Sequence, residues 1–296
     1  MTAPQEPAPR SLGDWLGVVG RGVAMGIAEL VPGVSGGTIA FVTGIYEELI
    51  GTLAGLRPTS LLVLRRAGWR HFWVSHNLTF LLALAFGMVL AVISFARVLG
   101  YLLDHVPTLV WGFFFGLIAA SVVHIGRYRR PWQLAGYGLL GVLAAVALAQ
   151  LGVRDGAAPA WLYFVGGMVA VSAWLLPAVS GSFLLLVLGL YEPVLRAFNA
   201  GEWLFPGLLL LGCAVGLLLF SRLLHWLMRR QREPVLALLT GFMAGSLPRL
   251  WPWHVDGAPV PPAAYEAALG QPAWLGFTVA AVVFGLIALW LLSRLE

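Results

Sequence analysis

The stretch ELVPGVSGGTIAFVTGIYEELI, residues 29–50, returns later in the chain as LLPAVSGSFLLLVLGLYEPVLR, residues 175–196. The two stretches align at a constant offset of 145 residues, the difference between positions 32 and 177. The offset pairs Pro32, Val34, Ser35, Gly36, Gly44, Tyr46 and Glu47 with Pro177, Val179, Ser180, Gly181, Gly189, Tyr191 and Glu192. Polar, small and acidic residues rarely repeat in this way by chance, so the chain contains an internal duplication.

The chain as a whole is strongly apolar. Of its 296 residues, 60% are hydrophobic and 10% are charged, and the mean hydropathy is +0.88. An ordinary soluble domain is about a quarter charged, so the natural solvent of this chain is lipid. Its eighteen basic residues are all Arg and lie between apolar runs, a pattern of membrane topology and not of nucleic-acid binding. The sequence has one cysteine, Cys213, and no metal-ligand motif, so we expect neither a metal nor a cofactor.

Six apolar runs are long enough to cross a bilayer as helices, which takes about 20 residues. They cover residues 78–100, 107–126, 133–152, 204–227, 234–250 and 274–294. The two repeated stretches differ, because Pro and Gly interrupt them and leave arms too short for a full span, such as 15–31 and 38–50. In lipid, broken backbone is tolerated only inside protein or beside water. Each repeated stretch therefore predicts a re-entrant helical hairpin.

We expect an all-α polytopic membrane protein with two inverted-topology repeats, each a re-entrant hairpin plus three transmembrane helices. The first repeat covers residues 1–132, with a disordered tail at about 1–10, a hairpin at about 15–50 and helices at about 78–126. Residues 133–159 hold the linking transmembrane helix of the first repeat. The second repeat covers residues 160–296, with a hairpin at about 160–197 and helices at about 204–294. Three crossings between the hairpins place the two halves in opposite orientations. Arg collects in alternate loops, which predicts that both termini are cytoplasmic.

The hairpin tips are the expected binding site. The breakers Pro32, Gly33 and Pro177 end the first arms, and each second arm then begins deep in the membrane with free N–H groups, which favour a phosphate. The expected binding residues are Ser35, Gly36, Gly37 and Thr38 in the first tip, Ser180, Gly181 and Ser182 in the second, and Arg21, Arg196 and Arg249 as guanidinium partners. The competing interpretations are close helix packing for any single Gly and a position at the lipid headgroups for any single Arg.

Acidic residues in or near the hairpins are candidates for coupling or gating. Glu29 lies three residues before Pro32 in an apolar arm, and intramembrane carboxylates commonly relay protons or pair with charges. Its equivalent position holds Trp174, so Glu29 would make the site asymmetric. Glu47 and Glu192 are equivalent to each other, and a position at the membrane interface explains them equally well. Protons or sodium are the candidate coupling ions, and the oligomeric state stays open.

Three segments together resemble the PopT-type undecaprenyl-phosphate translocase family of bacterial membrane proteins. They are MGIAELVPGVSGGTIAFVTGIYEELI (25–50), PAVSGSFLLLVLGLYEPVL (177–195) and GFMAGSLPRLWPW (241–253), and the resemblance extends over nearly the whole chain. It implies transport of undecaprenyl phosphate from the outer to the inner leaflet, which recycles the carrier for peptidoglycan and other envelope polymers, without covalent chemistry. Ala178 stands where the resemblance leads us to expect Gly, which loosens it at the second tip.

Two other functions compete with the translocase. Undecaprenyl-pyrophosphate phosphatases also have inverted repeats, and ELVPGVSGG is similar to their Glu-x-x-Pro-x-Ser-Ser stretch. Those enzymes place an Arg directly after the Ser of the second motif, whereas Ser180 is followed by Gly181, and neither tip contains His. The third alternative is a transporter of a small soluble anion, which explains the tips equally well. The sequence contains no GxxxxGK[ST] pattern for nucleotide binding.

Overall fold

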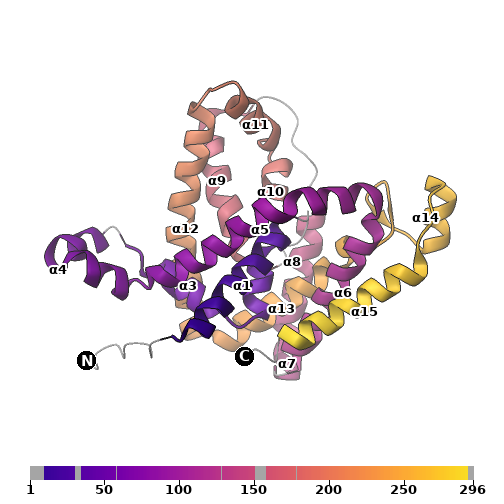
Figure 1. The fold of residues 1–296 in the computed structure, drawn as a ribbon, viewed down its shortest axis with the longest axis horizontal. Helices are drawn as coiled ribbons and strands as arrows, with labels where there is room; N and C mark the ends of the chain where they lie inside the picture. The colour runs from indigo at the N-terminus through magenta and orange to yellow at the C-terminus, as the bar shows by residue number, and fades with distance from the viewer. Residues whose placement is uncertain are drawn as a thin grey trace.

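The computed structural model describes residues 10–30, 35–57, 59–127, 129–150, 158–177 and 179–292. The predicted breakers Pro32 and Gly33 and nearly all of the expected tail lie outside these residues. The helices are α1 (Leu12–Glu29), α2 (Gly36–Val42), α3 (Tyr46–Gly55), α4 (Ser60–Ser75), α5 (Leu78–His105), α6 (Pro107–Gly126), α7 (Pro131–Gln133), the π-helical η1 (Leu134–Gly138), α8 (Leu139–Ala149), α9 (Ala160–Leu175), α10 (Gly181–Val187), α11 (Tyr191–Asn199), α12 (Leu204–Arg230), α13 (Arg232–Ser246), the 3-10 helix η2 (Leu247–Leu250), α14 (Pro262–Leu269) and α15 (Leu275–Leu292) (Figure 1). A short antiparallel pair, β1 (His254–Val255) with β2 (Ala258–Pro259), precedes α14.

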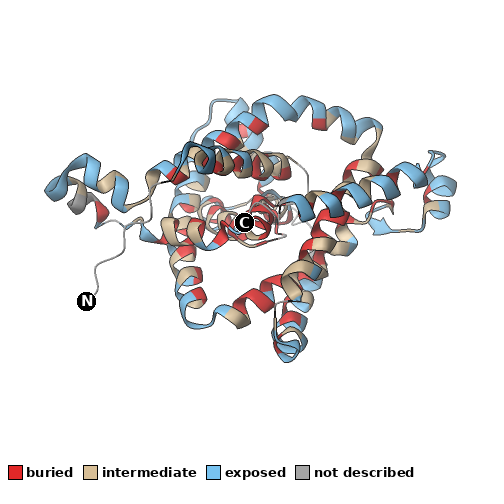
Figure 2. Cartoon of the chain, turned by 60° about the horizontal axis from the view of Figure 1, so that its bottom comes forward, coloured by how far each residue is buried: buried red, intermediate tan, exposed pale blue. Residues whose placement is uncertain are grey.

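The helices form a polytopic membrane protein, as the composition predicts. Among the described residues, four segments are long and apolar enough to span a bilayer: α5, α6, α12 and Pro131–Leu148, which joins α7, η1 and α8. Apart from α6, whose residues are mostly buried or half-buried, these segments are exposed over much of their surface (Figure 2), and large apolar side chains such as Phe86, Leu143 and Leu210 lie there. Apolar side chains exposed along long helices are what a lipid-facing surface requires. The fold is thus an all-α membrane fold.

Helices at corresponding positions of the two halves pack against corresponding partners. α1 packs along α5, and in the second half α9 packs along α12 (Figure 1). The remaining long helices pack against a helix of the other half: α6 packs along α15, and α13 packs along α8. By order along the chain, these four pairings map onto one another. The pairing agrees with a duplicated architecture, while the inverted orientation of the halves stays a prediction.

Glycine makes the closest helix crossings possible. At Gly22 and Gly87, on α1 and α5, an added Cβ would overlap backbone atoms of the opposing helix. At Gly167 and Gly212, on α9 and α12, it would overlap the carbonyl oxygens of the opposing helix in the same way. Gly22 and Gly167 are related by the repeat offset. Small residues let membrane helices approach until their backbones touch, so these positions carry packing and not ligand contacts.

We expect Gly212→Ala to destabilise the protein by about 1–3 kcal/mol, the usual cost of overpacking. Its new methyl group would meet the Phe164 carbonyl, and α9 and α12 would have to move apart. Gly207→Ala is the matched control on the same helix, because nothing lies within 4 Å of its added Cβ. Thermal unfolding in detergent measures both variants. Equal unfolding temperatures for the two would contradict this account of the crossing.

The second arms of the repeated stretches are bent, and the single arm expected at 38–50 is wrong. Gly44 and Gly189 have φ values of 74° and 68°, a left-handed conformation that glycine adopts without strain. They separate α2 from α3 and α10 from α11, and the second pair is bent by 98°. This geometry fits a broken span or a re-entrant loop, so the re-entrant hairpins stay a prediction. α2 and α10 have seven residues each, too short for a large helix dipole.

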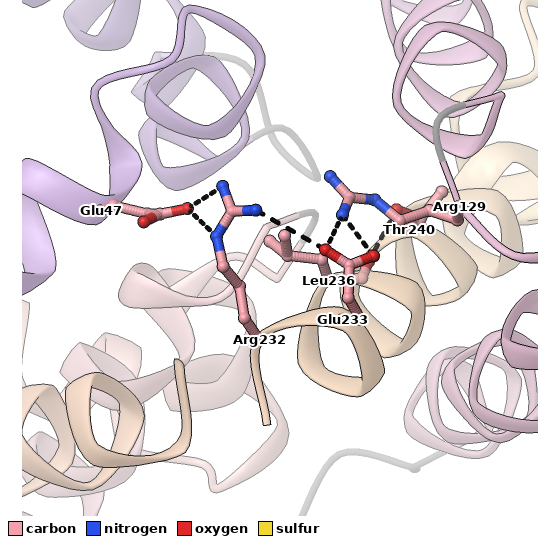
Figure 3. Close-up of polar contacts among 6 residues, drawn as sticks. All are labelled: Glu47, Arg129, Arg232, Glu233, Leu236 and Thr240. Atoms are coloured by element: carbon pink, nitrogen blue, oxygen red, sulfur yellow. Dashed lines mark hydrogen bonds and ion pairs between the residues drawn. The ribbon is translucent and has the colours of Figure 1, made fainter. Parts of the chain in front are cut away.

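Charged loops of both halves meet at one end of the molecule. Arg129, after α6, donates to both carboxylate oxygens of Glu233 at 2.8 Å. Arg232, at the start of α13, lies 2.6 Å from Glu47 of α3 and 3.6 Å from Glu233, which completes a network of four charges (Figure 3). The loop after α6 and the start of α13, one from each half, therefore lie together, while the side of the membrane on which they lie stays a prediction. Glu47 belongs to this network and is not placed at either tip.

Candidate functional site

The first tip, at the start of α2, is closed by the end of α9. Ser35 caps α2 by accepting a hydrogen bond from the Gly37 N–H at 3.1 Å, and its hydroxyl donates to the Trp174 carbonyl at 3.2 Å. Ser35 and Thr38 are fully buried. A Cβ on Gly37 would come within 2.6 Å of the Trp174 oxygen, so only glycine allows this approach. The predicted binding residues of the first tip are thus gathered, but they face protein.

Glu29 occupies the place at the first tip where an anion was expected. Its carboxylate accepts a hydrogen bond from the N–H of Gly36, the first residue of α2, and the Trp174 side chain also bonds it. A Cβ on Gly36 would lie 2.8 Å from Glu29 Oε1. Glu29 and Trp174 are equivalent positions of the two repeats, so equivalent residues touch each other here. The internal carboxylate satisfies the donor that would otherwise attract a phosphate.

The second tip, at the start of α10, borders an open cavity of about 580 Å³. Its lining comprises Trp111, Ser180, Ser182, Phe183, Leu186, Tyr191, Arg249, His254 and Gly257. The Ser180 and Ser182 hydroxyl oxygens are 2.8 Å apart, and Ser180 also caps α10 through the Phe183 N–H. The Arg249 guanidinium carbon lies 4.1 Å from the centre of the Phe183 ring. Hydroxyls, a guanidinium and a histidine are thus brought to one space.

Gly181 allows the second tip to pack closely against α9. A Cβ at this position would come within 2.5 Å of the Ala170 carbonyl oxygen. The contact fixes the start of α10, where Ser180 and Ser182 belong to the cavity lining. Pro177, the remaining predicted breaker, is buried two residues beyond the end of α9, which stops at Leu175. The sequence therefore explains why the helix ends where the cavity begins.

Equivalent tyrosines show how differently the two tips are packed. Tyr46 is 2% exposed, and its hydroxyl donates to the Leu175 carbonyl at 2.8 Å. Tyr191, the same position of the second repeat, is 44% exposed and lines the cavity. The first tip is closed while the second is open. One sequence motif therefore occupies two environments in one structure.

Residues 25–259, which contain both tips and Arg249, match a family model described as VCA0040-like, undecaprenyl phosphate translocase-like. The chain belongs to this family. A polyprenyl-phosphate transporter of Vibrio cholerae is 36% identical over 96% of both chains. A polyprenyl-phosphate transporter of Staphylococcus aureus is 34% identical over 80% of this chain and 86% of its own. No solved structure matches the chain.

The structure separates the three arginines that were predicted to bind the phosphate. Arg249 lines the cavity at the second tip. Arg196 instead pairs with Glu192 one turn away at 3.7 Å, and both side chains are about three-quarters exposed (75% and 79%). Arg21 donates through Nε to the Thr43 carbonyl at 3.3 Å, near the bend after α2. Arg196, one of the predicted phosphate partners, is therefore not in the described lining of this cavity, and the binding role of Arg196 and the coupling role of Glu192 stay predictions.

Three residues of the cavity lining were not predicted from the sequence: Trp111, Tyr191 and His254. His254 reaches the cavity because β1 and β2 fold back across a turn at Asp256 and Gly257, whose φ values are 50° and 77°. Two left-handed residues in an Asp-Gly pair are the signature of a tight hairpin turn. That signal is visible in the sequence and could have placed His254 near Arg249. The sequence also shows that Tyr191 is the repeat equivalent of Tyr46, but this equivalence does not reveal which of the two is exposed.

Proposed function

We propose that the protein carries undecaprenyl phosphate from the outer to the inner leaflet of the cytoplasmic membrane. The observation that carries the proposal is the cavity in which Ser180, Ser182 and Arg249 converge. Two hydroxyls and a planar guanidinium form the strong, charge-assisted hydrogen bonds that a phosphate monoester accepts. The headgroup binds there while the polyprenyl tail stays in lipid. The names of the Vibrio and Staphylococcus relatives support a polyprenyl phosphate as the substrate.

Transport exchanges the environments of the two tips. In the state described here the second tip is open and the first is closed by Trp174 and Leu175. The opposite state opens the first tip and closes the second, so that the headgroup passes from one set of hydroxyls to the other. Inverted-repeat transporters alternate by rocking one repeat against the other around a central site. The duplicated packing supports the same movement here.

The phosphate ester stays intact during this movement, and the protein acts as a translocase and not as an enzyme. Ser180 is followed by Gly181 and Ser182, not by the Arg of phosphatases, and neither repeated motif contains a His, although His254 of β1 lines the cavity. Glu29 is the coupling group, with a proton as its partner ion. Because its carboxylate holds the Gly36 N–H, releasing the tip to a phosphate requires that this bond break, and protonation weakens a carboxylate as an acceptor.

The charged end of the molecule faces the cytoplasm, and both termini lie there. Arg129 and Arg232 belong to that end, where loops of both halves meet (Figure 3). Cytoplasmic loops carry an excess of Arg, which supports this orientation. The cavity with Arg249 and His254 then opens toward the outer leaflet, where carrier lipid is left after export of envelope polymers such as peptidoglycan.

Thiol labelling of a Ser182→Cys variant tests the open cavity and its side. Cys213, the single native cysteine, is first replaced by Ala. We expect a membrane-impermeant thiol reagent to label residue 182 from the outer side, and a short-chain polyprenyl phosphate to slow the labelling. Thr38→Cys, at a fully buried position of the first tip, is the control that labels slowly from the outer side. Labelling of residue 182 from the cytoplasmic side alone would contradict the proposed orientation.

The bond between Tyr46 and Leu175 makes a second prediction. Tyr46→Phe leaves the Leu175 carbonyl without the donor that closes the first tip, at a cost of about 1–3 kcal/mol. We therefore expect about tenfold faster labelling of Thr38→Cys from the cytoplasmic side, because the opposite state gains population. Tyr163→Phe, at another buried tyrosine, is the control. Unchanged labelling with lowered thermal stability would show that the bond serves folding alone.

A further inference from the structure

A second cavity, of about 570 Å³, lies between α3 and α12, two helices that pack together. Its lining comprises Gly51, Ala54, Gly55, Arg57, Arg222, His225, Trp226, Arg229 and Arg230. None of these residues was among the binding residues predicted from the sequence. Four arginines and a histidine face the cavity, and no acidic residue is among its described lining. The site is therefore strongly cationic.

Small residues of α3 create the space. At Gly55 nothing lies within 4 Å of an added Cβ, and at Gly51 an added Cβ would meet the His225 ring at 3.5 Å. Ala54 is the third small residue on this wall. The opposite wall is α12, where the guanidinium carbon of Arg230 lies 5.1 Å from the centre of the Trp226 ring. The cavity is thus an aromatic and basic surface facing a wall without bulky side chains.

The arginines of this cavity are not neutralised by the protein. Arg222 donates to the Leu56 carbonyl at 2.7 Å, which fixes its guanidinium against the end of α3. Its Nε atom is buried and has no hydrogen-bond partner. Within the part of the chain that the structure describes, Arg10, Arg129, Arg196 and Arg232 form ion pairs, but no cavity arginine does. A buried N–H without an acceptor costs about 1–3 kcal/mol, so an added acceptor would stabilise this arrangement.

We propose that the cavity between α3 and α12 binds a phosphate monoester group, at a site separate from the two tips. Several guanidinium groups around one space match the oxygens of a phosphate, which accepts paired hydrogen bonds from each. The lining offers those groups together with a buried, unpartnered N–H of Arg222. The same chemistry serves a lipid headgroup or free phosphate. The site does not depend on the proposed transport, because binding alone defines it.

Equilibrium binding to the purified protein in an uncharged detergent tests the proposal. The probes are farnesyl phosphate and inorganic phosphate, each measured on a protein that carries Ser180→Ala and Ser182→Ala to weaken the second tip. Two variants then act on the cavity in different ways. Arg222→Gln with Arg229→Gln and Arg230→Gln removes charge, and Gly55→Leu fills the space but keeps every arginine. The matched control removes three exposed arginines of α4, through Arg65→Gln, Arg66→Gln and Arg70→Gln.

We expect both cavity variants to weaken binding at least tenfold, and the α4 control to leave it within twofold. Loss for both probes identifies a phosphate site open to soluble ligands, and loss for farnesyl phosphate alone identifies a lipid headgroup site. Thermal unfolding of each variant shows that it is folded. Wild-type affinity in folded Gly55→Leu would overturn the proposal. So would equal weakening by the α4 control, or equal displacement of farnesyl phosphate by phosphatidylglycerol, since either result means unspecific attraction to charge.

Discussion

Replacing Arg249 with Gln lowers polyprenyl-phosphate transport by at least tenfold and leaves the protein folded. A hydrogen bond to a charged group contributes about 1.5–3 kcal/mol, which corresponds to roughly 10- to 150-fold in binding. Arg249 lines the cavity beside Ser180 and Ser182, so its loss removes the positive charge that the headgroup meets there. Uptake of a labelled short-chain polyprenyl phosphate into proteoliposomes measures the effect.

Arg196→Gln is the matched control for this loss. Arg196 also follows the second motif, but its side chain is 75% exposed and paired with Glu192. An exposed pair contributes little to stability or to local charge, so transport stays within twofold of wild type. Arg249→Lys keeps the charge and loses the planar fork, and we expect partial activity from it. Equal losses in Arg196→Gln and Arg249→Gln would remove the assignment of the headgroup to this cavity.

Replacing Glu29 with Gln abolishes the response of transport to a proton gradient. The amide oxygen of Gln can still accept the hydrogen bond from the Gly36 N–H, so the first tip keeps its geometry. The side chain can no longer exchange a proton, so an imposed pH difference no longer drives accumulation. Exchange of the lipid down its own gradient continues.

The control for this variant is Glu47→Gln. Glu47 is also a carboxylate near a hairpin, but it pairs with Arg232 in the network of four charges (Figure 3). We expect its response to the proton gradient to match wild type. Accumulation by Glu29→Gln that still follows the pH difference would assign coupling to another group, and a sodium-dependent response in both proteins would replace the proton by sodium.

The duplication predicts much of the fold because its repeated residues, Pro, Gly and Ser, are unfavourable inside a helix that lipid surrounds. Pro, Gly and Ser inside an apolar run predict a broken helix, and α9 does end at Leu175, just before Pro177. The bends at Gly44 and Gly189 were not predicted, because a glycine in a helical pattern does not by itself reveal a left-handed conformation. The exchange of α8 and α15 between halves was also beyond the sequence, since apolar helices without a strong pattern can pack on many partners.

The candidate site was predicted in part. Of the residues predicted to bind the phosphate, Ser180, Ser182 and Arg249 line one cavity, while the Arg196 side chain is exposed and pairs with Glu192; phosphate binding by any of them stays a prediction. The difference lies in the direction of α11, which is set by the bend at Gly189 and not by sequence distance. That one tip is open and the other closed is a property of the conformation. Two copies of the same motif read alike in a sequence.

The central claim is that the protein moves a polyprenyl phosphate between leaflets without cleaving it. The most direct test is to reconstitute the protein in liposomes, follow the leaflet distribution of a labelled undecaprenyl phosphate and assay inorganic phosphate in parallel. We predict leaflet exchange well above that of empty liposomes, loss of exchange in Arg249→Gln, and no release of phosphate. Exchange no faster than in empty liposomes, with or without a proton gradient, would contradict the account, and release of phosphate from undecaprenyl pyrophosphate would identify a phosphatase instead.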